Sequence, residues 1–325
     1  MEISNEKFIR KLPEKDQELI AEILKLKKEK NILILAHNYQ REGVQLVADL
    51  LGDSLGLAKK VVNASQQNII FAGVRFMAET AKVLNLDKRN HFPAKGTLCK
   101  MASYLKADMI RDYKKKNPGI PVVLYINSTA ESKTMADIVC TSSNAIKVVK
   151  HIVEETNASK IGFGPDKNLG AYVSKMSGIP VDIIPPDGNC YVHHMYSLEN
   201  IQEAKKHYPN ATILVHPEAP SEVLDHADYV GSTAMILQYP KDHLETKSYI
   251  IGTEIGVTEI LRRTHPDMKF YPLNKKAVCF AMKSITLESV LECLQKIDTN
   301  EFVVELDKDV IEKSQKAIQR MIEIS

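Results

Sequence analysis

The sequence predicts an α/β protein with three similar three-layer α/β/α domains, each containing a parallel sheet. Two observations favour this class. Short apolar runs typical of buried strands alternate with amphipathic helical patterns, and this series of segments occurs three times along the chain. We expect the domains to span residues 1–105, 106–195 and 196–285, with residues 286–325 packed back on the first. We also expect the three equivalent units to pack around a pseudo-threefold axis.

The first predicted strand of each repeat is rich in Ile, Val and Leu and ends in polar residues. The three runs read "NILILAHNY", "PVVLYINS" and "ATILVHPE". An Ala-Asp dipeptide follows each, with its aspartate at Asp49, Asp137 and Asp228. A hydroxyl residue comes five positions later and precedes an apolar helical pattern, at Ser54, Ser142 and Thr233.

A second strand ending in glycine, a second helix and a third strand complete each repeat. The second strands read "NIIFAG", "KIGFG" and "YIIG". The third segment ends in a cysteine, 50, 53 or 51 residues after the reference aspartate: Cys99, Cys190 and Cys279. Cys140 and Cys293 have no counterparts. Burial alone imposes no such register, so the three matched cysteines indicate a shared function.

The composition excludes several classes of protein. The chain has 43 basic and 41 acidic side chains and 44% hydrophobic residues, which is typical of a globular protein without a nucleic-acid surface. Its N-terminus is charged, and no apolar run is long enough to span a membrane. Five cysteines without close pairs do not form the framework of a secreted scaffold. We therefore expect a cytoplasmic protein that binds neither nucleic acid nor membranes.

Polar residues at the ends of the first strands indicate a pocket. Residues 12 and 10 positions before the reference aspartates form three pairs: His37 with Tyr39, Tyr125 with Asn127, and His216 with Glu218. Residues i and i+2 of a strand face the same way, and functional side chains gather beyond the carboxyl ends of parallel strands. The hydroxyls at the helix starts could serve as N-caps or bind a substrate anion. His193, three residues after Cys190, could reach the same pocket or be exposed.

Three matched cysteines favour an iron–sulfur cluster over zinc. A structural zinc ion normally has four protein ligands, and no fourth equivalent residue exists here. A cluster held by three cysteines leaves one iron free to act as a Lewis acid on a substrate oxygen. The predicted chemistry is elimination of water or condensation.

The same residues give the chain its resemblance to the quinolinate synthase family. The resemblance runs from about Asn31 to Val290 through "LAHNYQ", "VADLLGDSL", "GVRFMAET", "TSSNA", "DKNLG", "HPEAP", "GST", "GTEIGV" and "MKSITLESV". It implies three α/β domains around a central [4Fe–4S] cluster. It also implies condensation of iminoaspartate with dihydroxyacetone phosphate to quinolinate, with release of phosphate and two waters, in de novo NAD biosynthesis. Functional coupling to an iminoaspartate-producing enzyme stays open.

The resemblance assigns roles to residues of this chain. Its cluster ligands match Cys99, Cys190 and Cys279. Its substrate-binding positions match His37, Tyr39, Ser54, Tyr125, Asn127, Ser142, His193, His216, Glu218 and Thr233. It implies that Glu218, Tyr39 and His37 assist proton transfer.

The chain departs from the family pattern at several positions. Ala219 stands where many relatives have cysteine, and Phe280 stands where many have proline. A C-x-x-C that forms a disulfide in some relatives is absent, which argues against a redox switch. "KGTLCKMASY" around Cys99 differs from the usual "AGCSMAD", so the repeat register is the stronger argument for that ligand. Another cluster-dependent hydro-lyase and a metal or redox sensor are the alternative functions.

Overall fold

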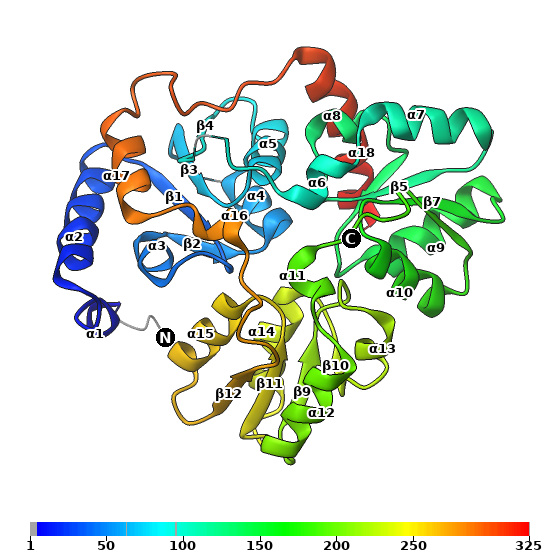
Figure 1. Cartoon of the computed structure of the whole chain (residues 1–325). Coiled ribbons are helices and arrows are strands. Elements are labelled where there is room, and N and C mark those ends of the chain that lie inside the picture. The colour runs from blue at the N-terminus through cyan, green and yellow to red at the C-terminus, as the bar shows by residue number, and fades with distance from the viewer. Residues whose placement is uncertain (1–4, 63, 95, 325) are drawn as a thin grey trace. The chain divides into compact units, whose positions relative to one another are not determined.

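Three four-stranded parallel sheets form the framework of the protein (Figure 1). The structure, a computed structural model, describes residues 5–62, 64–94 and 96–324. Helices flank each sheet, and all three sheets have the same order, in which the first strand of the repeat lies between the second and the third. The α/β class predicted from the repeats is confirmed. Each sheet lies within one of the three predicted repeats, whose boundaries stay a prediction.

The first sheet has the order β2-β1-β3-β4. Its inner strands are continuous apolar runs because both of their faces are covered. The strands are β1 (Leu33–His37), β2 (Leu50–Gly52), β3 (Asn68–Ala72) and β4 (Arg89–His91). The helices of this part are α1 (Glu6–Ile9), α2 (Glu14–Glu29), α3 (Glu42–Val47), α4 (Ser54–Val62), α5 (Arg75–Leu84), α16 (Phe280–Lys283) and α17 (Leu287–Gln295).

The second sheet has the order β6-β5-β7-β8, and every residue of its first strand is buried. Leu105, Ile110, Val122, Leu124 and Ile184 form part of its core. The strands are β5 (Val122–Tyr125), β6 (Ile138–Cys140), β7 (Ile161–Gly164) and β8 (Val181–Ile183). The helices are α6 (Lys100–Tyr104), α7 (Ala107–Lys116), α8 (Ala130–Lys133), α9 (Ala145–Thr156), α10 (Lys167–Ser177) and α18 (Lys308–Ile324).

The third sheet has the order β10-β9-β11-β12. Buried Tyr249 and Phe270 stack on neighbouring strands with ring centroids 5.4 Å apart. The strands are β9 (Thr212–Val215), β10 (Tyr229–Val230), β11 (Ser248–Gly252) and β12 (Lys269–Pro272). The helices are α11 (Tyr191–His194), α12 (Leu198–His207), α13 (Ser221–Leu224), α14 (Thr233–Asp242) and α15 (Ile255–Thr264).

Each repeat contains one strand more than the sequence pattern predicts. The additional strands are β2, β6 and β10, which directly follow the Ala-Asp dipeptides. They have only two or three residues, too few for hydrophobic periodicity to distinguish them from a loop. Cys140 lies in β6, which explains its complete burial.

The three reference aspartates have one structural role in common. Each carboxylate accepts a hydrogen bond from a backbone N–H at the start of the first strand, and each aspartate N–H donates to the carbonyl of that same residue. The donors to the carboxylates are Ile34, Val122 and Ile213, at 2.8, 2.7 and 2.8 Å. The aspartates therefore join the two strands at the end of each sheet opposite the carboxyl end of the first strand.

The segment after each of the last two cysteines also repeats. Ser197 begins α12 with a capping box that includes Asn200, and Thr286 begins α17 with one that includes Ser289. The equivalent sequences "SLENI" and "TLESV" thus specify equivalent helix starts.

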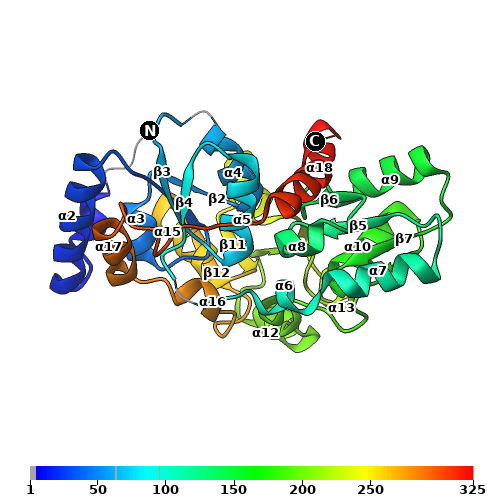
Figure 2. The same ribbon diagram turned by 90° about the horizontal axis from the view of Figure 1, so that it is seen from above.

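The chain forms two compact units, each made of two segments. The first comprises Met1–Leu98 and Val278–Leu306, and the second comprises Cys99–Ala277 and Asp307–Ser325. Within the first unit, α17 packs against α2 and α3. Within the second, α18 packs against β6 and α8 (Figure 2). Arg320 of α18 donates to the carbonyl of Asp137 at 2.7 Å. The expectation that all of residues 286–325 pack on the first domain is therefore wrong for α18.

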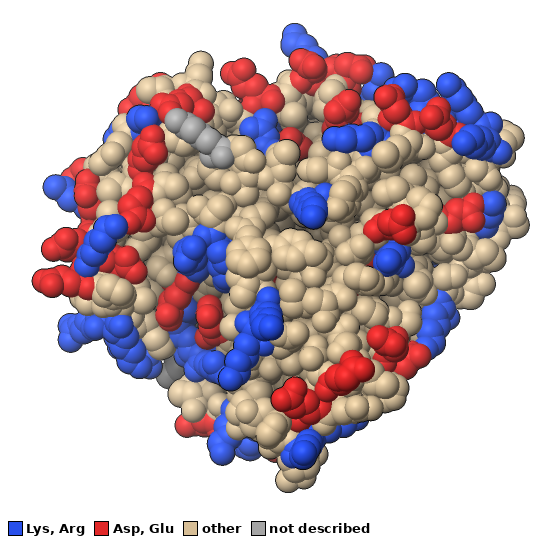
Figure 3. Space-filling model, viewed as in Figure 1, with Lys and Arg blue, Asp and Glu red and all other residues tan. Residues whose placement is uncertain are grey.

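No helix in the described parts of the chain is long and apolar enough to cross a membrane. On the face shown in Figure 3, the coloured basic and acidic side chains are intermixed. This pattern agrees with the near balance of charge in the sequence.

Candidate active site

Cys99, Cys190 and Cys279 occupy the same local position in their repeats. Each is the N-cap residue of a short helix, α6, α11 or α16, with an extended backbone. Each cysteine carbonyl accepts the backbone N–H four residues later, at 3.0, 2.8 and 2.9 Å. All three side chains are partly accessible. The register found in the sequence thus corresponds to one shared local structure.

The two cysteines outside the register are buried. Cys140 and Cys293 are both completely inaccessible to solvent. Burial raises the pKa of the Cys140 thiol, and burial together with the charge of Glu292 raises that of Cys293 to about 12. Both behave as small hydrophobic side chains that stay protonated.

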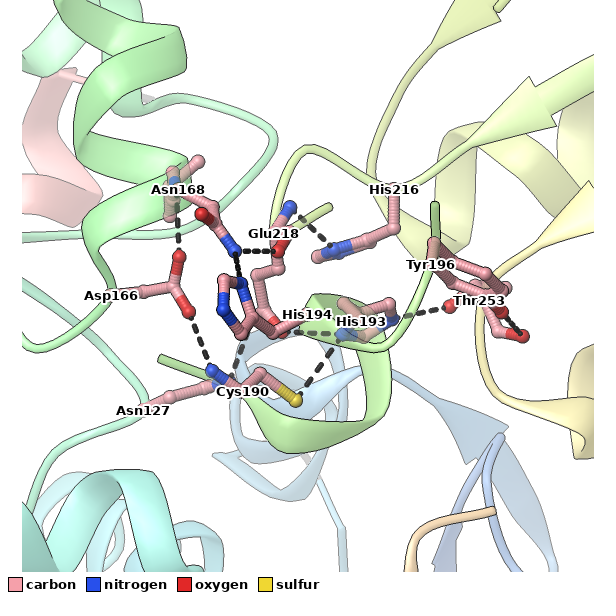
Figure 4. Close-up of polar contacts among 11 residues, drawn as sticks. Asn127, Asp166, Asn168, Cys190, His193, His194, Tyr196, His216, Glu218 and Thr253 are labelled. Carbon is pink, nitrogen blue, oxygen red and sulfur yellow. Dashed lines mark hydrogen bonds and ion pairs between the residues drawn. The ribbon is translucent and has the colours of Figure 1, made fainter. Parts of the chain in front are cut away.

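Cys190, His193 and Glu218 form a compact group of possible metal ligands (Figure 4). Nδ1 of His193 lies 2.7 Å from Oε2 of Glu218 and 3.3 Å from Sγ of Cys190. The donor atoms of all three lie within 4.8 Å of one another. Sulfur, imidazole nitrogen and carboxylate oxygen are all donors that metal ions bind in proteins.

Glu218 reaches this group from the loop after β9. Its backbone N–H donates to Nδ1 of His216 at 3.3 Å, as the N–H of Tyr39 donates to Nδ1 of His37 at 3.1 Å after β1. Because an N–H can only donate, Nδ1 is the acceptor in both rings, and a neutral ring carries its proton on Nε2. The His/Glu and His/Tyr pairs therefore adopt one local geometry, as the repeat predicts.

The charge of Glu218 is set by its buried surroundings. Burial alone raises its pKa, but the imidazoles of His193 and His216 and hydrogen bonds from His193 and Tyr125 outweigh this effect and lower the pKa to about 2. Nδ2 of Asn127 lies 3.5 Å from Oε1 of Glu218, at the limit of a hydrogen bond. Glu218 is therefore a buried carboxylate that stays ionised, held by residues of two sheets.

Asp166 and Asn168 join the loop of Cys190 to the loop of Glu218. Asp166 is completely buried at the start of α10, where its Oδ2 accepts the N–H of Cys190 at 2.9 Å. Burial and the neighbouring charge of Glu218 raise the pKa of Asp166. Asn168 donates from Nδ2 to the carbonyl of Glu218 at 2.7 Å. These two residues fix the relative positions of the loops (Figure 4).

The hydroxyl residues lie close to helix starts, but they are not the caps. Ser54 and Thr233 are the first residues of α4 and α14, and the preceding residues, Asp53 and Ser232, accept the capping N–H bonds at 2.7 and 3.4 Å. The expectation that Ser142 lies at the helix start is wrong, because α9 begins only at Ala145.

The second compact unit brings together many of the predicted residues. Contacts and electrostatic interactions join Tyr125, Asn127, Cys190, His193, His216 and Glu218. Cys99, Ser142 and Thr233 lie at or near the starts of α6, α9 and α14. The first unit contains Ser54, Cys279, His37 and Tyr39, and the rings of the last two make an edge contact at 4.5 Å.

Sequence reasoning did not identify Asp166, Asn168 or Thr253. Thr253 is completely buried between β11 and α15, and its Oγ1 lies 2.9 Å from Nε2 of His193. The sequence does contain a pattern that marks this region. In the second and third repeats, an acidic residue at a helix start, Asp166 or Glu254, lies two positions after the glycine that ends the second strand. An acid that directly follows a buried strand needs a hydrogen-bond partner.

Comparisons with known proteins cover nearly the whole chain. The model of the quinolinate synthetase A protein family matches residues 21–323. A quinolinate synthase from Thermotoga petrophila is 49% identical over 306 residues, which are 94% of this chain and 99% of that protein. One from Pyrococcus abyssi is 46% identical over 308 residues, 95% and 100% of the two chains. Since the family model and both relatives span the three sheets and the Cys190 group, this chain belongs to the quinolinate synthetase A family of enzymes.

Proposed function

We propose that the chain is a quinolinate synthase that acts in de novo NAD biosynthesis. Its reaction joins iminoaspartate to dihydroxyacetone phosphate and gives quinolinate, one phosphate and two waters. The atoms balance, because the three carbons of the phosphorylated ketone and the four of the imine supply all seven of the product. Family membership at 49% identity over 94% of the chain supports this proposal.

A [4Fe–4S] cluster held by Cys99, Cys190 and Cys279 is the proposed cofactor. The donor set fits, because these three thiols are accessible at equivalent helix starts, whereas Cys140 and Cys293 are buried. The proposal requires the three cysteines to meet at one cluster, in keeping with the predicted pseudo-threefold arrangement. When bound, such a cluster supplies a Lewis-acidic iron at its open position.

Substrate binding is assigned to polar residues near the carboxyl ends of the strands and to His193 of α11. They are His37, Tyr39, Ser54, Tyr125, Asn127, Ser142, His193, His216, Glu218 and Thr233. Ser54 and Thr233 are suited to an anion such as a carboxylate or phosphate, because the residue before each makes the capping bond. His37, at the end of β1, and His216, after β9, each direct Nε2 away from the backbone N–H that donates to Nδ1.

Proton transfer is assigned to Glu218, Tyr39 and His37. Ring formation requires protons to be removed from carbon and nitrogen and delivered to departing hydroxyls. Glu218 can accept a proton through the short contact with Nδ1 of His193, and its burial excludes competing water.

The contact of partly accessible Cys190 with buried His193 and Glu218 carries the proposal, because it brings a thiol, an imidazole and a carboxylate together. The test is anaerobic purification with iron and sulfide analysis, followed by a quinolinate assay with dihydroxyacetone phosphate and freshly made iminoaspartate. We expect about four iron atoms per chain and quinolinate formation. A chain with a full cluster that forms no quinolinate would favour another hydro-lyase or a sensor. Quinolinate formation by a chain that contains no iron would contradict the proposed cofactor.

A further inference from the structure

Thr253 contacts the segment that follows Cys190 through both its side chain and its backbone carbonyl. Its Oγ1 lies 2.9 Å from Nε2 of His193, and its carbonyl accepts a hydrogen bond from the Tyr196 hydroxyl at 2.6 Å. All three side chains are almost completely buried. His193 and Tyr196 both lie within six residues of Cys190, whereas Thr253 lies 60 residues beyond His193 (Figure 4).

The partners of His193 define which nitrogen faces the carboxylate. Nδ1 of His193 lies 2.7 Å from Oε2 of Glu218, and Nε2, on the opposite side of the ring, lies 2.9 Å from Oγ1 of Thr253. His216 stacks on the ring with centroids 4.5 Å apart and an interplanar angle of 23°, which limits its tilt.

We propose that Thr253 is a positioning residue that holds the His193 ring with Nδ1 directed at Glu218 and Cys190. Thr253→Val removes the hydroxyl that contacts Nε2, which is one of the two contacts by which Thr253 holds this segment. The equivalent positions of the other repeats, after the glycine that ends the second strand, are Val74 and Pro165, which have no hydroxyl. The hydroxyl contact with His193 therefore occurs at this position only in the third repeat.

The consequence for turnover rests on the proposed function, but the geometry of the ring does not. Partners of this kind, which orient a group near a metal site, typically affect activity 10- to 100-fold. We expect Thr253→Val to lower kcat by about that factor with little change in KM, because Thr253 is completely buried and acts through His193. Thr253→Ser, which keeps the hydroxyl, should stay within about threefold of the parent.

Thr258 offers a matched control. It is completely buried in α15, and its Oγ1 has no hydrogen-bond partner among the described residues. Thr258→Val makes the same chemical change close to Thr253 without removing a hydrogen bond. It should leave both the ring of His193 and turnover unchanged.

The direct readout is the ¹⁵N spectrum of the histidine rings in the full-length protein, recorded with and without its metal. The His193 signals are assigned by their loss in His193→Gln. We expect the same His193 ring signals in the parent, Thr253→Ser and Thr258→Val, and shifted or broadened His193 ring signals in Thr253→Val. Unchanged His193 ring signals in Thr253→Val, or an equal change in Thr258→Val, would overturn the inference. Equal losses of kcat in all three threonine variants would also overturn it. If the unmutated protein forms no quinolinate, the proposed function is wrong. The spectra still decide the role of Thr253 in that case.

Discussion

Oε2 of Glu218 lies 2.7 Å from Nδ1 of His193, and both side chains are almost completely buried. Glu218 follows β9 of the third sheet, whereas His193 belongs to the helix that begins after Cys190. An ion pair or charge-assisted hydrogen bond in such a site is little screened by solvent. The carboxylate is therefore coupled directly to a histidine that also contacts a proposed cluster ligand.

Glu218→Gln should lower kcat by about 10²–10⁴-fold while the cluster spectrum stays intact, because positioned acid–base catalysis contributes that much and glutamine keeps the shape. The measurement is kcat normalised to bound cluster. A structural role predicts the reverse, which is loss of folded protein or cluster with nearly normal turnover per cluster. A normalised kcat within about threefold of the parent would defeat the catalytic role.

The cysteines should divide into two classes. Cys99→Ala, Cys190→Ala and Cys279→Ala should each lose cluster absorbance and activity, because they share one position at helix starts. Cys140→Ala and Cys293→Ala should keep both, since these thiols are buried and protonated. Iron analysis after anaerobic purification distinguishes the classes. A full iron content in any of the first three variants contradicts the ligand assignment.

Ser232 and Thr233 should separate helix capping from substrate binding. Ser232 accepts the N–H of Met235, so Ser232→Ala should cost about 1 kcal/mol of stability and leave KM unchanged. Thr233→Val should instead raise KM for one substrate, by the roughly 1.5–3 kcal/mol expected for a hydrogen bond to a charged group. Urea denaturation and steady-state kinetics on both variants provide the comparison. An unchanged KM for both substrates in Thr233→Val excludes the anion role.

His91 should make the stability of the protein depend on pH. It is completely buried in β4, its Nε2 lies 3.0 Å from Oδ1 of Asn68, and its Nδ1 has no hydrogen-bond partner among the described residues. Burial, together with the charge of Arg89, lowers the pKa of His91 to about 4. Below the ordinary histidine pKa of about 6.5, His91 becomes protonated in the unfolded chain but stays neutral in the folded chain. The folded state therefore loses stability relative to the unfolded state as the pH falls from about 6.5 towards 4.

The expected loss from His91 is roughly 3 kcal/mol at pH 4, from 1.4 kcal/mol for each pH unit of the shift. His91→Gln, which cannot titrate, should flatten the pH dependence of the urea midpoint between pH 7 and 4.5. His207→Gln, on an exposed part of α12, is the control and should leave the parent profile unchanged. If His91→Gln and the parent lose stability in parallel, the buried histidine is not responsible.

The repeated sequence predicted the fold class and several of the residues that lie together around Cys190, because parallel strands and their polar ends are specified locally. Ser232 and Thr233 are adjacent, and either hydroxyl could cap the helix, so the sequence does not fix which of the two residues begins it. Only the backbone geometry decides which side chain accepts the helix N–H, and in the structure it is Ser232. Strands of two or three residues, such as β10, have too little pattern to be recognised. Thr253 was missed for a different reason. Its contact with His193 depends on how segments 60 residues apart pack, which no local pattern records.

The division of each compact unit into two segments has a consequence for synthesis. The first unit needs Val278–Leu306, and the second needs Asp307–Ser325. A nascent chain that ends before residue 278 therefore lacks part of both units, and β6 is without α18 until residues 308–324 are made. Domains generally fold as units while the chain is being synthesised, so neither unit can be completed before these segments are translated. Removal of α18 should leave β6 and α8 uncovered and open to proteases.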